Sequence, residues 1–242
     1  MAIVADRQRQ DAQPAFVLHS YPFRETSLVV EAFSRNHGRI ALVARGARRP
    51  RSSLRGVLLS FQPLLLSWTG KGELRTLVRA EWHGAHGALK GRALICGFYL
   101  NELLLKLLAR DDPHDRLFDA YRETLAALAG AADQEAILRR FEIRLLRELG
   151  YAVTLDREAE TGEPIAPRGR YVYVVERGPV AAGAARKGVE LSGQTLLDMQ
   201  SGNFASALTQ QESKALMRAL LNHCLGNQVL HTRQLMRDLQ EL

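Results

Sequence analysis

Arginines concentrate in one short stretch of the chain, residues 38–55. Residues 45–55 hold five guanidinium groups and no carboxylate, at Arg45, Arg48, Arg49, Arg51 and Arg55. Charges of one sign at this density repel one another unless an anion or salt screens them. This set of arginines is therefore suited to binding a polyanion.

A strand followed by a loop must position these arginines. A short apolar run follows Gly38 and predicts a β-strand over residues 39–44. Gly46 and Pro50 then predict an irregular loop. Ser53 in this loop suits hydrogen bonding to phosphate better than nucleophilic chemistry, because no general base stands near it in the sequence.

The excess of positive charge belongs to the first third of the chain. Residues 1–80 contain 13 Lys and Arg against 5 Asp and Glu, a balance of +8. The whole chain contains 33 against 26, so the remaining residues hold 20 against 21, a balance of −1. A basic face of this kind attracts phosphates at long range and makes binding salt-dependent.

The composition favours a folded cytoplasmic protein. A chain of 242 residues with 46% hydrophobic content forms one large domain or two ordinary ones, which excludes disorder throughout. The start of the chain lacks the apolar core of a signal peptide. The most apolar stretch, residues 93–109, contains Asn101, Glu102 and Lys106 and is shorter than the ~20 residues of a membrane span.

The N-terminal part predicts a small closed barrel. Turn residues recur at intervals of about ten and separate five short strands, over residues 15–19, 27–33, 39–44, 57–68 and 73–80. We expect residues 1–14 to be flexible and residues 15–82 to form an OB-fold, which offers single-stranded nucleic acid a cationic groove and aromatic faces. The aromatic residues that could stack on bases, or else fill the core, are Tyr21, Phe23, Phe33, Phe61 and Trp68.

Residues 83–242 predict a mostly helical domain with an irregular insert. Helices are expected over residues 88–110, 114–128 and 133–149, and the insert covers residues 151–190, with a small hairpin near 170–175. Ser192 predicts the cap of a helix that ends near Gln200. Residues 209–212 read as a capping box for a helix that ends at Gly226. A last helix is expected over residues 231–242.

Enzymatic motifs are absent from the sequence. It contains no P-loop and no dinucleotide-binding glycine pattern. His83 and His86 lack further ligands for a metal, and Asp111 and Asp112 look like residues at a helix start. Two cysteines, Cys96 and Cys224, are expected to be buried thiols. The sequence therefore favours a binding protein over an enzyme such as a nuclease.

The order of these features resembles the bacterial RecO family of DNA repair proteins and recombination mediators. The matching segments are residues 38–48, 53–55, 61–64, 99–104, 141–146, 149–151 and 226–233. They run through nearly the whole chain, and the strand with the arginine loop is the most diagnostic of them.

The resemblance implies a non-enzymatic mediator with an N-terminal OB-fold and a helical C-terminal domain. It implies binding of single- and double-stranded DNA, annealing of complementary strands, and help in loading RecA onto DNA coated by single-strand binding protein. It also implies partnership with RecR and with the acidic C-terminal tail of single-strand binding protein. The expected place is the cytoplasm, at the nucleoid.

The candidate contacts divide into two sets. The expected DNA contacts are Arg39, Arg45, Arg48, Arg49, Arg51, Ser53, Arg55 and Lys71. The expected contacts to a protein partner are Lys214, Arg218, Arg233 and Arg237. The alternative function is a generic OB-fold interaction or scaffold module that binds RNA or other protein partners.

Two departures limit what is carried over from the family. Some members hold a structural zinc with cysteine pairs, but here Glu158 and Thr161 stand at the corresponding positions, and we expect no zinc. The terminal motif often carries lysines where this chain has Gln228 and His231. This second departure leaves Arg233 as the retained cation of that motif.

Overall fold

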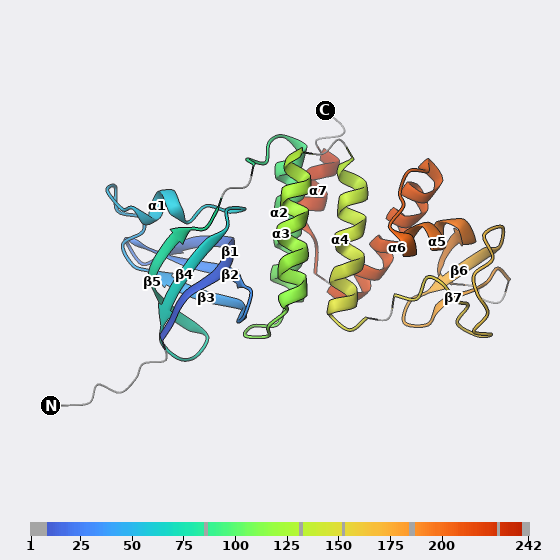
Figure 1. The fold of residues 1–242 in the computed structure, drawn as a ribbon, viewed down its shortest axis with the longest axis horizontal. Helices are drawn as coiled ribbons and strands as arrows, with labels where there is room; N and C mark the ends of the chain where they lie inside the picture. The colour runs from blue at the N-terminus through green and yellow to red at the C-terminus, as the bar shows by residue number, and fades with distance from the viewer. Residues whose placement is uncertain are drawn as a thin grey trace. The chain divides into compact units, whose positions relative to one another are not determined.

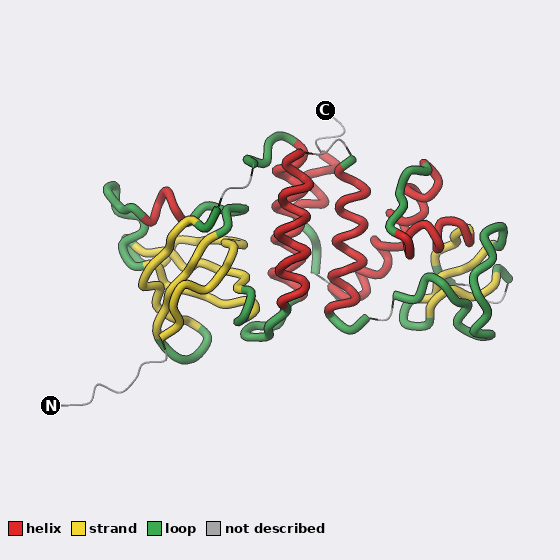
Figure 2. Tube along the Cα trace, in the orientation of Figure 1, coloured by secondary structure: helices red, strands yellow, loops and turns green. Residues whose placement is uncertain are grey.

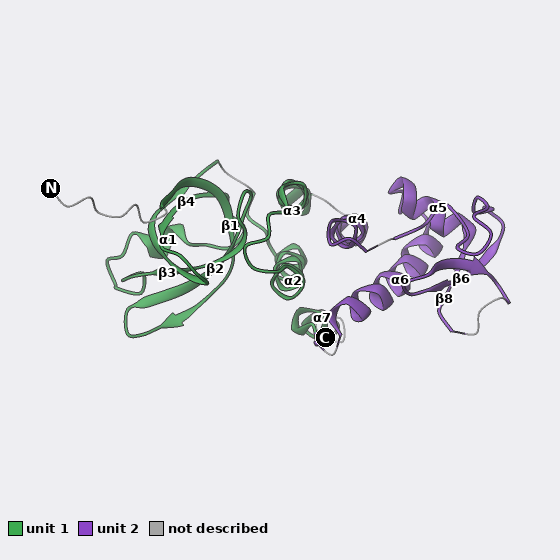
Figure 3. Ribbon diagram, turned by 90° about the horizontal axis from the view of Figure 1, so that it is seen from below, with its two compact units in different colours: residues 1–130, 230–242 green, residues 131–229 purple. Residues whose placement is uncertain are grey.

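The chain forms two compact units in the computed structural model. The structure describes residues 9–84, 87–130, 133–151, 153–183, 187–226 and 228–238. One unit comprises residues 1–130 and 230–242, and the other comprises residues 131–229 (Figure 3). The sequence predicts a division at residue 83, whereas these units part within the helical region.

Five strands of the first unit close into a barrel (Figure 1). They are β1 (Arg9–Phe23), β2 (Ser27–Ser34), β3 (Gly38–Ala44), β4 (Leu64–Thr69) and β5 (Leu74–Trp82). Their order around the barrel is β1-β2-β3-β5-β4; β3 pairs with β5 in parallel and the other pairs are antiparallel. The predicted five-stranded barrel is confirmed.

The connection between β3 and β4 differs from the prediction. Residues 57–68 were expected to form one strand, but a short helix, α1 (Leu54–Val57), comes first and β4 begins only at Leu64. Val57 and Leu58 pack against the barrel core, so their hydrophobicity reflects packing in this connection and not strand pairing. Strand β1 also begins earlier than expected, at Arg9.

Strands β1 and β2 bury side chains on both of their faces. On the inner face, Val17 of β1 and Ala32 of β2 belong to the core of the barrel. On the outer face, Phe16 of β1 and Phe33 of β2 contact Phe118 of α3 (Asp115–Gly130), each with ring centroids 5.4 Å apart. Burial of large aromatic side chains is a dominant stabilising contribution, so α3 and the barrel form one packed body.

Polar contacts hold helices α2 (Arg92–Leu107) and α7 (His231–Asp238) in this unit. The buried Asn101 of α2 donates a hydrogen bond from Nδ2 to the carbonyl oxygen of Leu18 at 2.8 Å. The carboxylate of Glu102 accepts from the backbone N–H groups of His231 and Thr232, both at 2.9 Å. These N–H groups have no partner within α7, so Glu102 caps the helix from another element.

The second unit combines helices with a small sheet, drawn in yellow beside its helices in Figure 2. Its helices are α4 (Gln134–Glu148), α5 (Gly193–Ser201) and α6 (Ala207–Leu225). Its strands are β6 (Arg170–Val174), β7 (Gly178–Ala181) and β8 (Val189–Ser192), in the order β7-β6-β8. The predicted hairpin near residues 170–175 is thus part of a three-stranded sheet.

One predicted helix cap is confirmed and another is wrong. The Ser192 side chain accepts a hydrogen bond from the N–H of Thr195 at the start of α5, as expected. The prediction that residues 209–212 form the capping box of α6 is wrong, because α6 begins at Ala207, two residues before Thr209. Thr209 instead donates to Asp198 at 2.7 Å, and Glu212 accepts from Ser192. Both side chains of the predicted capping box therefore bind residues that lie more than ten positions away in the sequence.

Candidate nucleic-acid interface

The loop after β3 turns its arginines to solvent. Ala47 is 1% exposed and joins the barrel core, so it anchors the loop at its start. The N–H of Arg48 donates to the carbonyl oxygen of Thr26 at 2.8 Å, which fixes the backbone against the β1–β2 turn. The side chains that project outward belong to Arg45, Arg48, Arg49, Arg51, Ser53 and Arg55, all of which are exposed. We call residues 45–55 the arginine loop.

The β1–β2 turn adds a further cation to this surface. Arg48 donates from Nη1 to the carbonyl oxygens of Arg24 and Glu25, both at 3.3 Å. Arg24 itself is exposed and lies over the ring of Phe23, 5.2 Å from its centroid. Sequence reasoning missed Arg24, because only the pairing of β2 with both β1 and β3 brings this turn beside the loop. Its positive φ of 53° in a residue other than glycine marks the turn as constrained.

Strand register places Arg39 and Lys71 at the other end of β3. Arg39 is the second residue of β3. Strands β3 and β5 run parallel, and Ala41 near the start of β3 pairs with Leu74 at the start of β5. Lys71 lies in the β4–β5 turn just before Leu74, whereas the arginine loop follows the last residue of β3. The structure therefore brings Arg45 to Arg55 together and leaves these two residues apart from them.

Arg39 is held by protein groups, while Lys71 is exposed. The guanidinium of Arg39 donates to the carbonyl oxygen of Leu108 at 3.1 Å and lies 3.4 Å from the carboxylate of Glu31. Arg110 binds the other oxygen of Glu31. Glu31 has only 7% of its side chain exposed, so two guanidinium groups satisfy a nearly buried carboxylate.

Most of the proposed stacking aromatics belong to the core. Phe33, Phe61 and Trp68 are 0%, 7% and 1% exposed. Phe23 is partly buried beneath Arg24, and only Tyr21, at 41% exposure, presents a large surface to solvent. Phe33, Phe61 and Trp68 could stack on nucleic-acid bases only if they left the core. Packing in the core therefore explains these three residues better than stacking does.

The expected partner-binding cations belong to two different units. Lys214 and Arg218 are exposed on α6, and Lys214 lies 3.8 Å from Glu135 of α4. Arg233 belongs to α7 of the first unit, where its guanidinium lies 5.9 Å from the ring centroid of Tyr99. Arg237 falls in the same helix, but its side chain is outside the described residues.

The described residues offer no assembled metal centre. Within the described ranges, no three His, Cys, Asp or Glu side chains are grouped to hold a metal ion. Asp111 forms an ion pair with Arg75 at 2.7 Å, and His86 is outside the described residues. Cys96 is buried as expected, while Cys224 is half-buried, and burial raises the pKa of the Cys224 thiol. A raised pKa leaves this thiol protonated and a poor nucleophile.

The barrel and the exposed arginine loop have the features of OB-fold proteins that bind nucleic acid. No helix in the described part of the chain has the length and apolarity needed to cross a membrane. Residues 10–86 match the family described as Recombination protein O N terminal, and residues 89–236 match Recombination protein O C terminal.

Two relatives match this chain over almost the whole length of both proteins. DNA repair protein RecO of Nitrosospira multiformis is 60% identical over 239 residues, which are 98% of this chain and 99% of that protein. DNA repair protein RecO of Aromatoleum aromaticum is 58% identical over 240 residues, covering 99% of this chain and 100% of that protein. The chain belongs to the RecO family, and it is a non-enzymatic recombination mediator of DNA repair.

Proposed function

We propose that this mediator binds the phosphates of single- and double-stranded DNA through the arginine loop. The observation that carries the proposal is the exposure of five arginines on a loop anchored by Ala47 and by the bond from Arg48 to Thr26. Arg24 extends this surface. Neutralising phosphates lets two strands approach each other, so annealing of complementary strands needs no covalent chemistry.

The partners follow from the family. We propose that the chain acts with RecR and helps to load RecA onto DNA coated by single-strand binding protein, in the cytoplasm at the nucleoid. In this proposal residues 15–82 contact DNA and residues 83–242 contact proteins. Arg39 and Lys71 stay predicted DNA contacts at the far end of β3.

A triple substitution tests the arginine loop. Arg48→Ala, Arg49→Ala and Arg51→Ala together are expected to weaken DNA binding and to reduce the slope of log K against log salt by about 2–3, because three phosphate contacts are lost. The measurement is a salt titration of binding to a labelled oligonucleotide, single-stranded and duplex.

The matched control removes the same charge elsewhere. Arg157→Ala, Arg168→Ala and Arg177→Ala change three exposed arginines of the second unit and should leave the slope unchanged. Equal slopes for both triple variants would remove the arginine loop from the DNA site. A wild-type protein indifferent to DNA would instead favour the RNA or scaffold function.

The acidic tail of single-strand binding protein is proposed to contact the cations on α6. Lys214 and Arg218 lie one helical turn apart and are exposed, which suits an acidic peptide. Arg233 and Arg237 of α7, in the first unit, stay predicted contacts to a protein partner. Titrating the tail peptide into the full chain should show weaker binding for Lys214→Glu with Arg218→Glu; unchanged affinity would exclude this surface.

The second unit is proposed to fold without zinc. The residues at the family's ligand positions are Glu158 and Thr161. Structural zinc sites are built from Cys and His ligands, and this pair supplies neither of them. Thr161 donates from Oγ1 to Glu158 at 3.1 Å, and Glu158 accepts from the N–H of Ala181 at 3.1 Å. These hydrogen bonds tie the turn to β7 where a metal would otherwise do so. Stoichiometric zinc in elemental analysis of the purified protein would contradict this proposal.

A further inference from the structure

Three aromatic rings lie in a row along one face of strand β1. They belong to His19, Tyr21 and Phe23, which stand two residues apart, so their side chains point to the same side of the sheet. The ring centroids of His19 and Tyr21 are 6.0 Å apart. His19 is exposed, Tyr21 is 41% exposed, and Phe23 is partly buried beneath the guanidinium of Arg24. We call these three rings the ring row.

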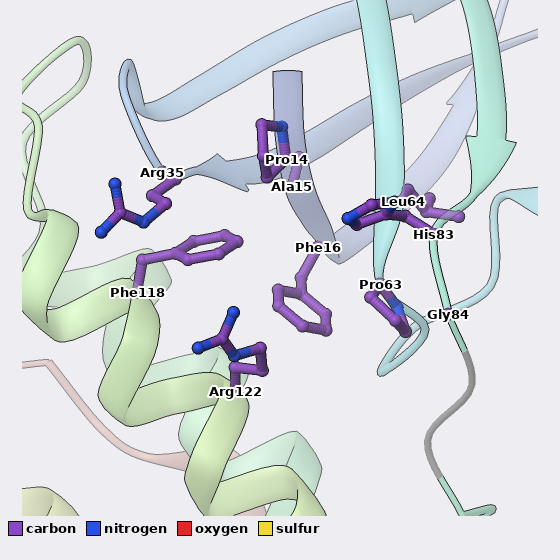
Figure 4. A pocket seen from close by; sticks show the side chains of 10 residues that line it. All are labelled: Pro14, Ala15, Phe16, Arg35, Pro63, Leu64, His83, Gly84, Phe118 and Arg122. Atoms are coloured by element: carbon purple, nitrogen blue, oxygen red, sulfur yellow. The ribbon is translucent and has the colours of Figure 1, made fainter. Parts of the chain in front are cut away.

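Helix α3 covers another part of this outer face of β1 and leaves the ring row open. Phe16 lies on the same face, since its partner Phe33 in β2 stands an even number of residues from the partners of His19 and Tyr21. Figure 4 shows the rings of Phe16 and Phe118 near each other, and both are buried, at 0% and 3% exposure. A base cannot reach such rings. It can reach His19 and Tyr21 from solvent.

Strand register places the ring row beside the arginine loop. Tyr21 pairs with Val29 of β2, and Val29 pairs with Val43 of β3, two residues before Arg45. Two strand spacings amount to about 10 Å. A DNA strand held by the loop can cover this distance within the roughly 4–16 nucleotides that one such barrel binds.

Positive charge dominates the surroundings of the ring row. Arg24 and the five arginines of the loop are accompanied by one exposed carboxylate of the same turn, Glu25. Glu31 lies opposite the row in β2, but Arg39 and Arg110 bind its carboxylate, which is 7% exposed. The row therefore combines open rings with neighbouring cations, as sites for single-stranded nucleic acid do.

We infer that Tyr21, with His19 beside it, stacks on unpaired bases of the DNA strand whose phosphates the arginine loop binds. The inference rests on the proposed function and adds a preference for single strands to it. Nucleotides in a strand of B-DNA follow one another at about 3.4 Å, whereas the two rings are 6.0 Å apart. Only a strand that unstacks and extends can place successive bases on successive rings. A base that pairs must leave the row, so stacking competes with annealing.

Tyr21→Ala tests stacking in the full-length protein without a change of charge. Its affinity for a short oligothymidine should fall about fivefold or more, which is the effect of losing one stacked base. The slope of log K against log salt should stay the same, because no phosphate contact is lost. Affinity for a blunt duplex of the same length should change by less than about twofold, because its bases are not free to stack on a ring. Anisotropy titrations at several salt concentrations measure all three quantities.

Tyr21→Phe and Tyr151→Ala are the matched controls. Tyr21→Phe keeps the ring and should bind the oligothymidine as wild type does. Tyr151 is also 41% exposed but lies in the second unit, so Tyr151→Ala should leave DNA binding unchanged. Equal losses for Tyr21→Ala and Tyr151→Ala would overturn the inference. A loss for Tyr21→Phe as large as that for Tyr21→Ala would also overturn it, because the hydroxyl and not the ring would then be the contact.

Photo-crosslinking locates the stacked base directly. An oligonucleotide that carries 5-iododeoxyuridine should crosslink to the tryptic peptide of residues 10–24, which contains the whole ring row. Excess unlabelled single strand should prevent this crosslink, and Tyr21→Ala should weaken it. Crosslinks confined to other peptides would overturn the inference. Equal losses of affinity for single strand and duplex in Tyr21→Ala would overturn the preference for single strands.

The outcomes separate this inference from the proposed function. If the triple variant of the arginine loop loses DNA affinity while Tyr21→Ala binds the oligothymidine as wild type does, the loop is the DNA site and the inference about the ring row fails alone. If the triple variant binds DNA as wild type does, the proposed function fails and the inference fails with it.

Discussion

Replacing Gly38 with alanine is expected to lower the free energy of unfolding of the first unit by about 3 kcal/mol or more. A β-carbon at Gly38 would lie 2.0 Å from the carbonyl oxygen of Asp112, a contact with backbone that no side-chain rotation relieves. Gly38 also has a φ of 64°, which residues with a side chain rarely adopt. Alanine therefore adds steric overlap to backbone strain.

The close approach at Gly38 joins the barrel to the connection between α2 and α3. The N–H of Asp111 donates to the carbonyl oxygen of Arg39 at 3.0 Å, and the Arg39 side chain donates to Leu108. Glu31 binds both Arg39 and Arg110 beside them. Moving Asp112 away would break this set of contacts, so the effect should spread beyond one residue.

Gly72→Ala is the matched control for Gly38→Ala. Gly72 has a φ of 89°, but a β-carbon there would meet nothing within 4 Å. Only backbone strain remains, which costs about 1 kcal/mol. Urea unfolding of both variants measures the difference, and equal losses would show that the contact with Asp112 is unimportant. The arginine loop lies at the other end of β3, so the folded fraction of Gly38→Ala should keep the contribution of this loop to DNA binding.

Features encoded in adjacent residues could be predicted from the sequence. The arginine loop is one, because glycine, proline and like charges in a single segment fix both an irregular backbone and its exposure. The Ser192 cap is another, since the cap and the N–H that it accepts from lie three residues apart. The barrel follows from turn residues at regular intervals, which constrain strand length without reference to distant partners.

Features that depend on pairing between distant segments could not be predicted. Lys71 and the arginine loop are both basic, yet only the parallel β3–β5 register shows that they lie at opposite ends of β3. Val57 and Leu58 have the apolar character of a strand, and only the structure shows that they pack against the barrel core instead of pairing in a sheet. Glu212 has the spacing of a capping box, but a residue twenty positions earlier in the chain binds it.

Replacing Glu212 with alanine is expected to destabilise the second unit by about 3 kcal/mol. Glu212 is 9% exposed and accepts three hydrogen bonds of 2.9 Å, from the Arg170 guanidinium and from both the N–H and the hydroxyl of Ser192. Truncation leaves the N–H at the end of β8 without its acceptor. It also detaches the sheet from α6, because Arg170 begins β6 and Ser192 ends β8.

The matched control for Glu212→Ala is Glu190→Ala. Glu190 pairs with the same arginine, Arg170, but at 3.9 Å and with 78% of its side chain exposed, so its removal should cost less than about 0.5 kcal/mol. Urea unfolding at pH 7 compares the two variants. Equal losses would mean that the charge of Arg170, and not the buried hydrogen bonds of Glu212, holds the sheet.

The pH dependence of the free energy of unfolding tests whether the ionised carboxylate of Glu212 is the stabilising species. Burial raises the pKa of Glu212, but hydrogen bonds from Thr195, Ser192 and Arg170 outweigh burial and lower the pKa below its ordinary value of 4.5. A carboxylate with a lowered pKa in the folded state contributes its full stability above 4.5 and loses it as the pH falls through the lowered value. The difference between wild type and Glu212→Ala should therefore be constant from pH 7 to about pH 5 and shrink at lower pH. A difference that stays constant to pH 3 would show that packing, and not charge, accounts for the loss.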